Sequence, residues 1–370
     1  KHSTTPRQLL PLFIYGALLT VGVMLACSGQ ADASSYTFTD LGTPTGYSSL
    51  AYAINNAGQI VGQQSIGSGY ATLWEGSTVT TLASTGGTST KASAINNLGQ
   101  VAGQSVIPSS NTIWAWRATT WNGSNMTLLG ALPDTVHSWA QAINSAGVVA
   151  GLSITDRYNS HGHATVWNGS TITDLGIDSY AFGINDSGQV VGIASDSGVT
   201  RATLWNGITA TTLGSLGGSG DSSAAYAINN AGVVVGYSCC IDTEYHATVW
   251  NGATITDLGA GQALAINNTG VVVGVMGAHA ALWNGTSFTD LNSFLDASTV
   301  SEGWELNEAT GINDNGWIVG YGFNKKIGAT HGFLLMPTQP VPEPETYAML
   351  LAGLGILGAF VRRKKPETQI

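Results

Sequence analysis

The middle of the chain repeats one pattern of apolar and polar positions. Each copy has the form Ile-Asn-x-x-Gly, then one further residue, two small apolar residues and a final Gly. The seven copies begin at Ile54, Ile95, Ile143, Ile184, Ile228, Ile266 and Ile312. Their mean spacing of 43 residues is typical of propeller blades and is too long for one coil of a β-helix.

Each copy divides into four predicted strands, which the fifth copy shows clearly. AAYAIN leads into a turn at Asn-Ala-Gly, VVVGYS follows, and HATVW is joined to TITDLG by Asn251-Gly252. Asn-Gly between strand-like residues is a strong hairpin signal, because both turn positions favour positive φ. The Asn of Ile-Asn-x-x-Gly is expected to cap its own turn with its side chain. The Val-rich second strands lack polar alternation, which predicts that neighbouring blades cover both faces.

The last copy lacks a fourth strand, and a spare one precedes the first copy. Met336 and Pro337 follow Leu335 without a hairpin turn, whereas YTFTDLG, from Tyr36 to Gly42, has the form of a fourth strand. Pairing these two segments would remove an open sheet edge. The sequence therefore predicts an all-β domain over residues 34–337: a seven-bladed β-propeller of four-stranded blades, its last blade closed by the N-terminal strand.

Composition and charge agree with this fold and narrow the choice of partner. The 370 residues include 49 Gly, and only 9 % are charged, so helices should be scarce. Residues 36–337 hold six Lys and Arg against eighteen Asp and Glu, a net charge of −12. This charge repels phosphate backbones and argues against nucleic-acid binding. Cations and neutral glycans are the more plausible ligands.

Residues 1–33 have the pattern of a secretory signal peptide. Basic Lys1 and Arg7 are followed by an apolar run to about Ala26, and Ala31-Asp32-Ala33 has the form of a cleavage site. The pattern implies export by the general secretion machinery. An uncleaved anchor and a lipoprotein attached through Cys27 are the alternatives.

Residues 338–346 form a Pro-rich linker, and residues 347–370 form an apolar segment with a basic end. The fifteen residues from Tyr347 to Val361 carry no charge and would span about 22 Å as a helix, less than a hydrocarbon core of about 30 Å. The cations that follow, Arg362, Arg363, Lys364 and Lys365, would hold this end on the cytoplasmic side. We expect both terminal apolar segments to be helical and this one to tether the chain transiently, with a permanent anchor as the alternative.

The C-terminal region resembles a known sorting signal. Pro342-Glu343-Pro344, the apolar run and Arg362-Arg363 match, in order, the three parts of the PEP-CTERM signal of Gram-negative bacteria that make exopolysaccharide. The resemblance implies recognition by an exosortase, a membrane transpeptidase, and delivery to the cell surface or the extracellular matrix.

The repeats resemble the extracellular HAF-repeat family, named for a His-Ala-Phe phrase. The corresponding phrases here are His163-Ala164-Thr165, His246-Ala247-Thr248, His279-Ala280-Ala281 and His331-Gly332-Phe333. Members of that family are exported repeat proteins without a settled activity, so this resemblance implies a location rather than a mechanism.

Two repeated positions carry candidate chemistry. The histidines of these phrases could form a ring of metal ligands, but Tyr70, Arg117 and Arg201 take the same position in other copies. The mixture favours a structural role, either a hydrogen bond between blades or a packed aromatic or cationic side chain. The Asp of the fourth strand could bond to this residue or simply make a polar turn at the strand end (Asp40, Asp174, Asp257 and Asp290). Six tryptophans recur one residue before the hairpin turn, and we expect them to fill the gaps between blades rather than to stack on sugars: Trp74, Trp121, Trp167, Trp205, Trp250 and Trp283.

Aromatic residues outside the repeat are better candidates for ligand contact, because loops on a rigid scaffold carry recognition. They are Trp114, Trp116, Tyr158 and Trp304, with Trp139 in addition. The acidic stretch 296–308, with Glu302, Glu305 and Glu308, could supply calcium ligands or a glycosidase carboxylate pair, although a solvated loop is expected. The adjacent Cys239 and Cys240 would form a vicinal disulfide or stay as thiols.

The sequence carries no nucleophile elbow, phosphate-binding loop or dinucleotide motif in a suitable context. We therefore predict a non-enzymatic binding or structural module without catalytic residues, cofactor or metal site. It would act at the cell surface or in the matrix, in association with exopolysaccharide, and would meet the membrane only through its terminal segments. A glycan-acting hydrolase and a permanently anchored surface protein are the alternatives.

Overall fold

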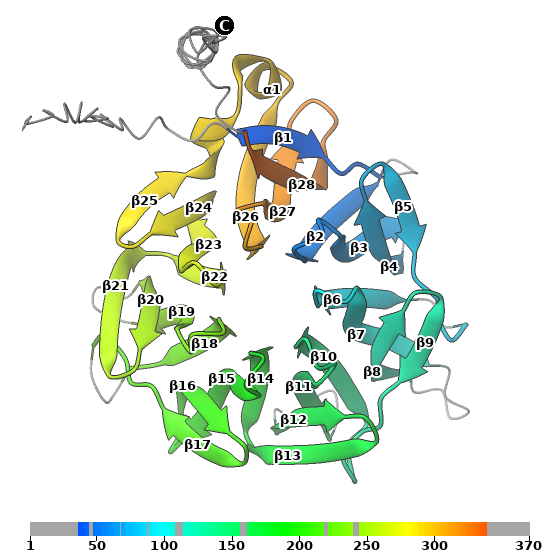
Figure 1. Ribbon diagram of the computed structural model, residues 1–370, viewed down its shortest axis with the longest axis vertical. Helices are drawn as coiled ribbons and strands as arrows, with labels where there is room; N and C mark the ends of the chain where they lie inside the picture. The colour runs from blue at the N-terminus through cyan, green and yellow to red at the C-terminus, as the bar shows by residue number, and fades with distance from the viewer. Residues whose placement is uncertain are drawn as a thin grey trace, which may run out of the picture. The chain divides into compact units, whose positions relative to one another are not determined.

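The described residues form one ring of seven four-stranded antiparallel sheets, as the repeat pattern predicts (Figure 1). The computed structural model describes residues 36–43, 47–66, 68–86, 89–107, 114–155, 161–217, 221–239 and 244–338. In six blades the strands follow one another along the chain, and in the seventh the order is β1-β28-β27-β26. The prediction of a closed propeller is confirmed.

Strands in equivalent positions of the blades share one role. The innermost strands, which surround the channel (Figure 1), are β2 (Ser48–Ile54), β6 (Thr90–Ile95), β10 (His137–Ile143), β14 (Ser179–Ile184), β18 (Ser223–Ile228), β22 (Gln262–Ile266) and β26 (Trp304–Ile312). The second strands are β3 (Ile60–Ile66), β7 (Gln100–Ile107), β11 (Val149–Ile154), β15 (Gln189–Asp196), β19 (Val234–Cys239), β23 (Val271–Met276) and β27 (Ile318–Asn324). The third strands are β4 (Ser68–Glu75), β8 (Ala115–Asn122), β12 (Gly162–Asn168), β16 (Val199–Asn206), β20 (Tyr245–Asn251), β24 (His279–Asn284) and β28 (Ala329–Pro337). The outer strands are β5 (Thr78–Thr81), β9 (Asn125–Leu128), β13 (Thr171–Ile177), β17 (Thr209–Thr212), β21 (Thr254–Ala260), β25 (Ser287–Asp290) and β1 (Tyr36–Asp40).

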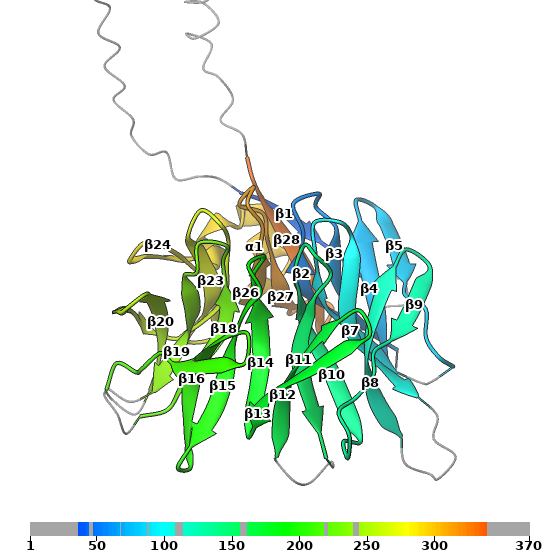
Figure 2. The same ribbon diagram turned by 60° about the horizontal axis from the view of Figure 1, so that its bottom comes forward.

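The ring is closed by strands from opposite ends of the described chain. β1 pairs with β28 from Tyr36↔Pro337 to Asp40↔Phe333, and the two strands lie side by side in both Figure 1 and Figure 2. A short insertion between blades, η1 (Leu291–Phe294) and α1 (Ala297–Ser301), supports the closure, because Phe294 packs 4.5 Å from Tyr36 between ring centroids. The predicted edge-sealing role of the N-terminal strand is confirmed.

The repeated tryptophans are buried between blades, as predicted. All six are at most 2 % exposed: Trp74, Trp121, Trp167, Trp205, Trp250 and Trp283. Trp121 and Trp167 each donate an indole N–H at 2.8 Å to a carbonyl in the preceding inter-blade connection, that of Ala83 and Gly130 respectively. These two indoles therefore combine apolar filling with a fixed orientation, whereas the indole N–H groups of Trp74 and Trp250 are buried without a partner among the described residues.

The Ile-Asn phrase makes a hydrogen-bonded ring that the sequence alone did not suggest. As expected, each Asn caps its own turn: Asn229 Oδ1 accepts the N–H groups of Ala231 and Val233 at 3.1 and 3.0 Å. In addition, every Asn donates Nδ2–H to the backbone carbonyl of the equivalent Asn in the next blade, at 2.9 to 3.2 Å. The members of this amide ring are Asn55, Asn96, Asn144, Asn185, Asn229, Asn267 and Asn313, and the bond from Asn313 to Asn55 closes it.

The last Gly of each phrase is required by close packing between strands. A Cβ on Gly62 would lie 1.9 Å from the Leu50 carbonyl oxygen, and the equivalent glycines of the other blades meet a backbone carbonyl at 1.9 to 2.0 Å. Since that oxygen belongs to the innermost strand, the first two strands of each blade approach closely only at glycine.

The repeated histidines bond to the repeated aspartates, as the sequence suggested. His163, His246, His279 and His331 place Nδ1 at 2.7 to 3.0 Å from Asp174, Asp257, Asp290 and Asp40 respectively. Each Asp also accepts a backbone N–H two residues further on, for example that of Gly42 at 2.7 Å from Asp40. The His331–Asp40 pair joins β28 to β1, so this clasp contributes to ring closure.

The predictions for the termini concern residues outside the described ranges. These are the signal peptide at 1–33, the linker beyond residue 338 and the sorting segment at 347–370. Within the described ranges, no helix is long and apolar enough to cross a membrane.

Replacing a member of the amide ring should destabilise the whole propeller. Asn229→Ala leaves two partly buried N–H groups and the buried Asn267 carbonyl without their partners, which should lower the free energy of unfolding by about 2–3 kcal/mol. Urea denaturation followed by tryptophan fluorescence measures the change. Asn206→Ala, at an exposed hairpin turn, is the control and should cost less than about 0.5 kcal/mol. Equal losses in the two variants would contradict a special role for the ring.

Removing the clasp at the closure should loosen β1 selectively. In Asp40→Ala, backbone amides of β1 and β28 should exchange hydrogen faster, because no hairpin turn joins these two strands and their pairing depends on non-covalent contacts alone. Asp174→Ala removes the same bond within blade three, where a two-residue turn joins the paired strands, so its local exchange should change less. Hydrogen exchange with mass spectrometry compares the variants, and a larger effect in Asp174→Ala would refute the argument.

Candidate functional site

One residue in each innermost strand is set apart by a β-bulge. In every blade the register between the first two strands shifts at the same place, and β26 has a second shift, at Asn307. The residues without a partner at the shared place are Tyr52, Ser93, Gln141, Phe182, Tyr226, Leu264 and Thr310. Bulges re-aim side chains, and these seven residues, together with Lys91, line a cavity of about 270 Å³. We call it the channel cavity.

The members of the amide ring lie three residues after the bulge residues, just beyond the end of each innermost strand. The residues that follow the ring members line a polar cavity of about 180 Å³ with them. Most of these side chains bond to the adjacent blade: Asn230 donates to Asp186 at 2.8 Å, and Asn268 donates to Asp314 at 3.0 Å. Although burial opposes ionisation, hydrogen bonds from Ser145 and Asn230 lower the pKa of Asp186. Most polar side chains at this end of the channel therefore form hydrogen bonds that hold adjacent blades together.

Aromatic rings form one side of the channel cavity. Phe182 and Tyr226, from adjacent blades, have centroids 5.6 Å apart. Tyr226 in turn contacts Tyr237 at 5.7 Å, and Tyr237 contacts Tyr245 at 4.6 Å. Tyrosine hydroxyls are neutral at pH 7, and burial, reinforced by the neighbouring tyrosines, raises the pKa of Tyr226 and of Tyr237 further.

The opposite wall carries the charged groups of the site. The Lys91 Nζ lies 4.2 Å from the centroid of the Tyr52 ring, a cation–π contact between adjacent blades. Burial lowers the pKa of Lys91. Burial, followed by the charge of Glu308, raises the pKa of Tyr52 to about 12. Glu308 itself accepts a hydrogen bond from the Tyr321 hydroxyl at 2.7 Å.

Of the aromatic residues selected from the sequence, those that the structure describes do not line the channel cavity. Trp114 is 48 % exposed and directly precedes β8, while Trp116 is half-buried in β8 and donates its backbone N–H to His137 Nδ1 at 3.1 Å. Trp139 is half-buried and stacks on the His137 ring at 5.9 Å. Tyr158 lies outside the described residues.

The prediction of ligand contact at Trp304 is corrected. This side chain is only 7 % exposed and packs 5.0 Å from Phe38 and 5.9 Å from His331, between ring centroids. It fills the space under the closing strand β1. Trp304 has no equivalent in the other copies because it packs against β1 and β28, the strand pair that closes the ring and that the other blades lack.

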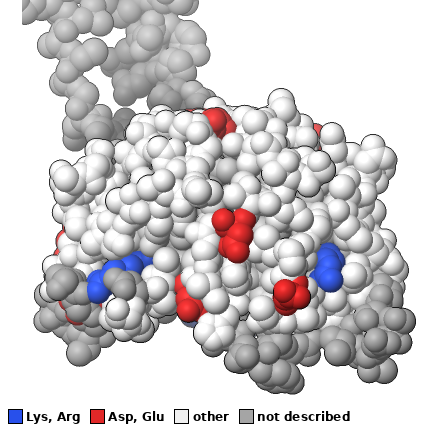
Figure 3. Space-filling model, turned by 90° about the horizontal axis from the view of Figure 1, so that it is seen from below, with Lys and Arg blue, Asp and Glu red and all other residues white. Residues whose placement is uncertain are grey.

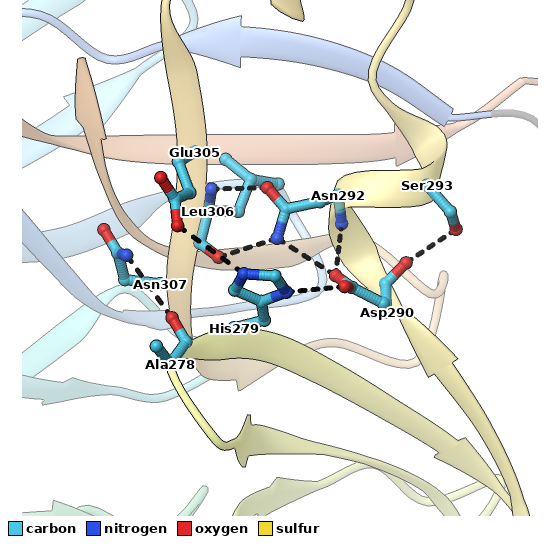
Figure 4. A network of polar contacts seen from close by, with 8 residues as sticks. All are labelled: Ala278, His279, Asp290, Asn292, Ser293, Glu305, Leu306 and Asn307. Atoms are coloured by element: carbon cyan, nitrogen blue, oxygen red, sulfur yellow. Dashed lines mark hydrogen bonds and ion pairs between the residues drawn. The ribbon is translucent and has the colours of Figure 1, made fainter. Parts of the chain in front are cut away.

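Two carboxylates of the acidic stretch, those of Asp296 and Glu305, make structural bonds, and Figure 4 shows the contact between Glu305 and His279. Asp296 caps α1 by accepting the Thr299 N–H at 2.7 Å. Glu305 lies 2.6 Å from Lys325 Nζ and 3.5 Å from His279 Nε2, which ties blade six to blade seven. Neither carboxylate faces another across a cavity, and the described residues contain no group of three or more His, Cys, Asp or Glu placed to hold a metal ion.

The repeated histidines and the adjacent cysteines are the two remaining candidates from the sequence. The repeated histidines lie on third strands and bond to Asp, so they do not form a ring of ligands around the channel. Cys239, at the end of β19, is disulfide-bonded, whereas its neighbour Cys240 lies outside the described residues.

Sequence reasoning missed the channel-lining residues, although a signal for them exists. They occupy the position three before the ring Asn in every copy, and their identities vary while the residues on either side are Ala or Gly. At this position the residue differs from copy to copy, while the residues on either side stay small in all seven copies. Such a position indicates a side chain on which the packing of the blades does not depend. The outer surface is sparsely charged, and the face in Figure 3 shows isolated acidic and basic side chains among uncharged residues.

Comparison with known families identifies the C-terminal region. Residues 340–365 match the model of the PEP-CTERM protein-sorting motif, so the expected sorting signal is confirmed. None of the curated proteins compared with the sequence shows significant similarity to it.

Three solved structures show similarity to the chain at low sequence identity. The β-propeller domain of the Trilobed protease from Pyrococcus furiosus is 10 % identical with a TM-score of 0.39, covering 54 % of this chain and 64 % of that one. TolB from Acinetobacter baumannii is 10 % identical with a TM-score of 0.41, covering 79 % and 64 %. The tricorn protease is 8 % identical with a TM-score of 0.23, covering 77 % and 35 %. The chain thus spans less than two thirds of each of these structures.

The buried position of Lys91 should be measurable as a lowered titration midpoint. With ¹³C-methylated lysines, NMR should show the Lys91 amine titrating below the ordinary value of 10.5, because burial penalises its charged form. Lys91→Arg identifies the resonance by its loss. A midpoint at or above 10.5 would show that the amine is solvated and that the channel cavity is more open than described.

Proposed function

We propose that this protein is an exosortase-sorted extracellular propeller that binds polysaccharide without chemically changing it. The matched PEP-CTERM motif at residues 340–365 supports export and a cell-surface route. The proposal assigns Pro342, Glu343 and Pro344 to recognition by the exosortase. The resemblance to HAF-repeat proteins supports the same extracellular location.

The terminal segments complete the proposed route. Residues 1–33 act as a signal peptide, and residues 347–361 act as a helical tether that is held temporarily in the inner membrane by Arg362 and Arg363. A disulfide at Cys239 agrees with an oxidising compartment outside the cytoplasm. The protein then reaches the cell surface or the extracellular matrix.

The observation that carries the binding proposal is the set of seven bulges around the channel. They direct aromatic, amide and hydroxyl side chains into one cavity, with Phe182 and Tyr226 on one side and Gln141, Ser93 and Thr310 on the others. Sugars offer apolar faces that pack on aromatic rings and hydroxyl groups that bond to amides and hydroxyls. The residues of the cavity therefore suit an uncharged or weakly charged glycan.

The chemistry around the cavity supports binding rather than hydrolysis. A glycosidase places two carboxyl groups about 5 to 9.5 Å apart across the scissile bond. The described residues that line the channel cavity include no carboxylate, and the nearby Glu308 is engaged by Tyr321. No cofactor is required by this proposal, and calcium can be tested directly by chelation.

Phe182→Ala should weaken binding to exopolysaccharide purified from the producing strain. The loss of one stacking ring is expected to lower affinity about 3- to 10-fold, equivalent to about 0.5–1.5 kcal/mol. The mature secreted protein is assayed by isothermal titration calorimetry with and without a calcium chelator. Phe288→Ala, a 43 % exposed ring on the outer strand β25, is the matched control and should bind as the wild type does.

Two results would count against this function. Absence of binding by the wild type would remove polysaccharide as the ligand. Release of reducing sugars during incubation would show a hydrolase instead of a binding module. Thermal melting of both variants identifies any loss of affinity that comes from unfolding.

A further inference from the structure

Blade five carries a continuous row of tyrosines from the channel to its outer side. Tyr226 lies on the innermost strand β18, Tyr237 on β19 and Tyr245 at the start of β20. Their rings touch in sequence, with centroid distances of 5.7 and 4.6 Å. We call these three residues the tyrosine strip. Tyr226 lines the channel cavity, and Tyr245 is 50 % exposed.

No other blade has aromatic residues at all three of these positions. The residues equivalent to Tyr237 are Gln63, Gln104, Leu152, Ile193, Val275 and Tyr321, and those equivalent to Tyr245 are Gly69, Trp116, Gly162, Thr200, Ala278 and Thr330. Because six blades fold with other residues there, the propeller does not require this row. The tyrosine strip is therefore a feature that blade five adds to the common scaffold.

The strip has the surface chemistry of a glycan-binding platform. Successive rings are tilted by 52° and 67°, so each tyrosine presents part of its ring and its hydroxyl differently from the next. The tyrosine hydroxyls are neutral at pH 7, and burial raises the pKa of Tyr226 and Tyr237 further. The repeating combination of apolar ring and uncharged hydroxyl complements a chain of sugar units, which repeats the same two features.

We infer that the tyrosine strip binds an extended, hydroxyl-rich polysaccharide chain, which runs from the exposed Tyr245 across Tyr237 into the channel cavity. This inference rests on the proposed function and extends it from a cavity to a site for several consecutive sugar units. Continuity supports it, because Tyr226 belongs to both the strip and the cavity. A neutral chain is favoured, because the three side chains of the strip are themselves uncharged phenols at neutral pH.

The inference predicts that affinity depends on chain length. The probe is a size-fractionated partial acid hydrolysate of the producing strain's exopolysaccharide, and the protein is the mature secreted chain. For the wild type, affinity should rise from disaccharides to longer fragments as the chain reaches Tyr245. Tyr245→Ala should lose about 3- to 10-fold in affinity for long fragments and keep wild-type affinity for the shortest fragments that bind.

Two further variants separate recognition from folding. Tyr245→Trp keeps a large ring and should retain the length dependence. Tyr47→Ala removes a tyrosine of similar exposure, 58 %, outside the strip and should behave as the wild type does. Melting temperatures are compared for all variants, so that a destabilised protein is recognised.

The outcomes distinguish this inference from the proposed function. If fragments bind with an affinity independent of length, or if Tyr245→Ala binds long fragments as tightly as the wild type does, the strip is not a binding surface although the channel cavity is. If Tyr245→Ala weakens short and long fragments equally, Tyr245 acts through the fold, and the inference is again overturned. If neither the fragments nor the intact polysaccharide bind the wild type, the proposed function itself fails.

Discussion

The hydrogen bonds between successive asparagines are the interaction on which the rest of the propeller depends. Each ring Asn satisfies its own turn through Oδ1 and reaches the next blade through Nδ2, so one side chain defines both a hairpin and its neighbour's position. Buried amides are costly unless all their groups are paired. The arrangement is satisfied in full only when every blade is present and Asn313 meets Asn55, which makes closure a condition of stability.

Because the ring and the buried tryptophans fix the blades, the channel-lining positions are free to differ. The bulge places one side chain per blade beside the axis, and neighbouring Ala and Gly residues leave it room. Phe182 and Tyr226 on one side and Lys91 with Tyr52 on the other give the cavity two unlike walls. The common scaffold thus supports a site of low symmetry, as recognition of a particular ligand requires.

Most of the fold follows from the sequence, because it depends on local signals that recur. The spacing of Ile-Asn predicts the blades, and Tyr36–Gly42 predicts the closing strand. Asn-Gly predicts where the outer hairpins lie, but the Asn ends the third strand and only the Gly takes a turn position with positive φ. The pairing of His with Asp was also foreseeable, since both recur with the same spacing. The bulges and the Nδ2 bonds were not, because register and inter-blade distance are tertiary properties. The prediction for Trp304 failed for a related reason. A tryptophan that does not recur in the other copies can be exposed in a loop or buried under β1, and the sequence pattern does not distinguish the two.

The pairing of β1 with β28 also governs how the molecule reaches its folded state. His331 and Asp40 are 291 positions apart in the chain, and contacts of such long range make folding slow, since a large loop must close first. Before residues 329–337 have formed β28, both β1 and the outer edge of β27 lack their strand partner. Unpaired strand edges of this kind are prone to aggregation. A chain that crosses a membrane before folding would therefore complete its ring only after its last strand has arrived, so secretion and folding are coupled in time.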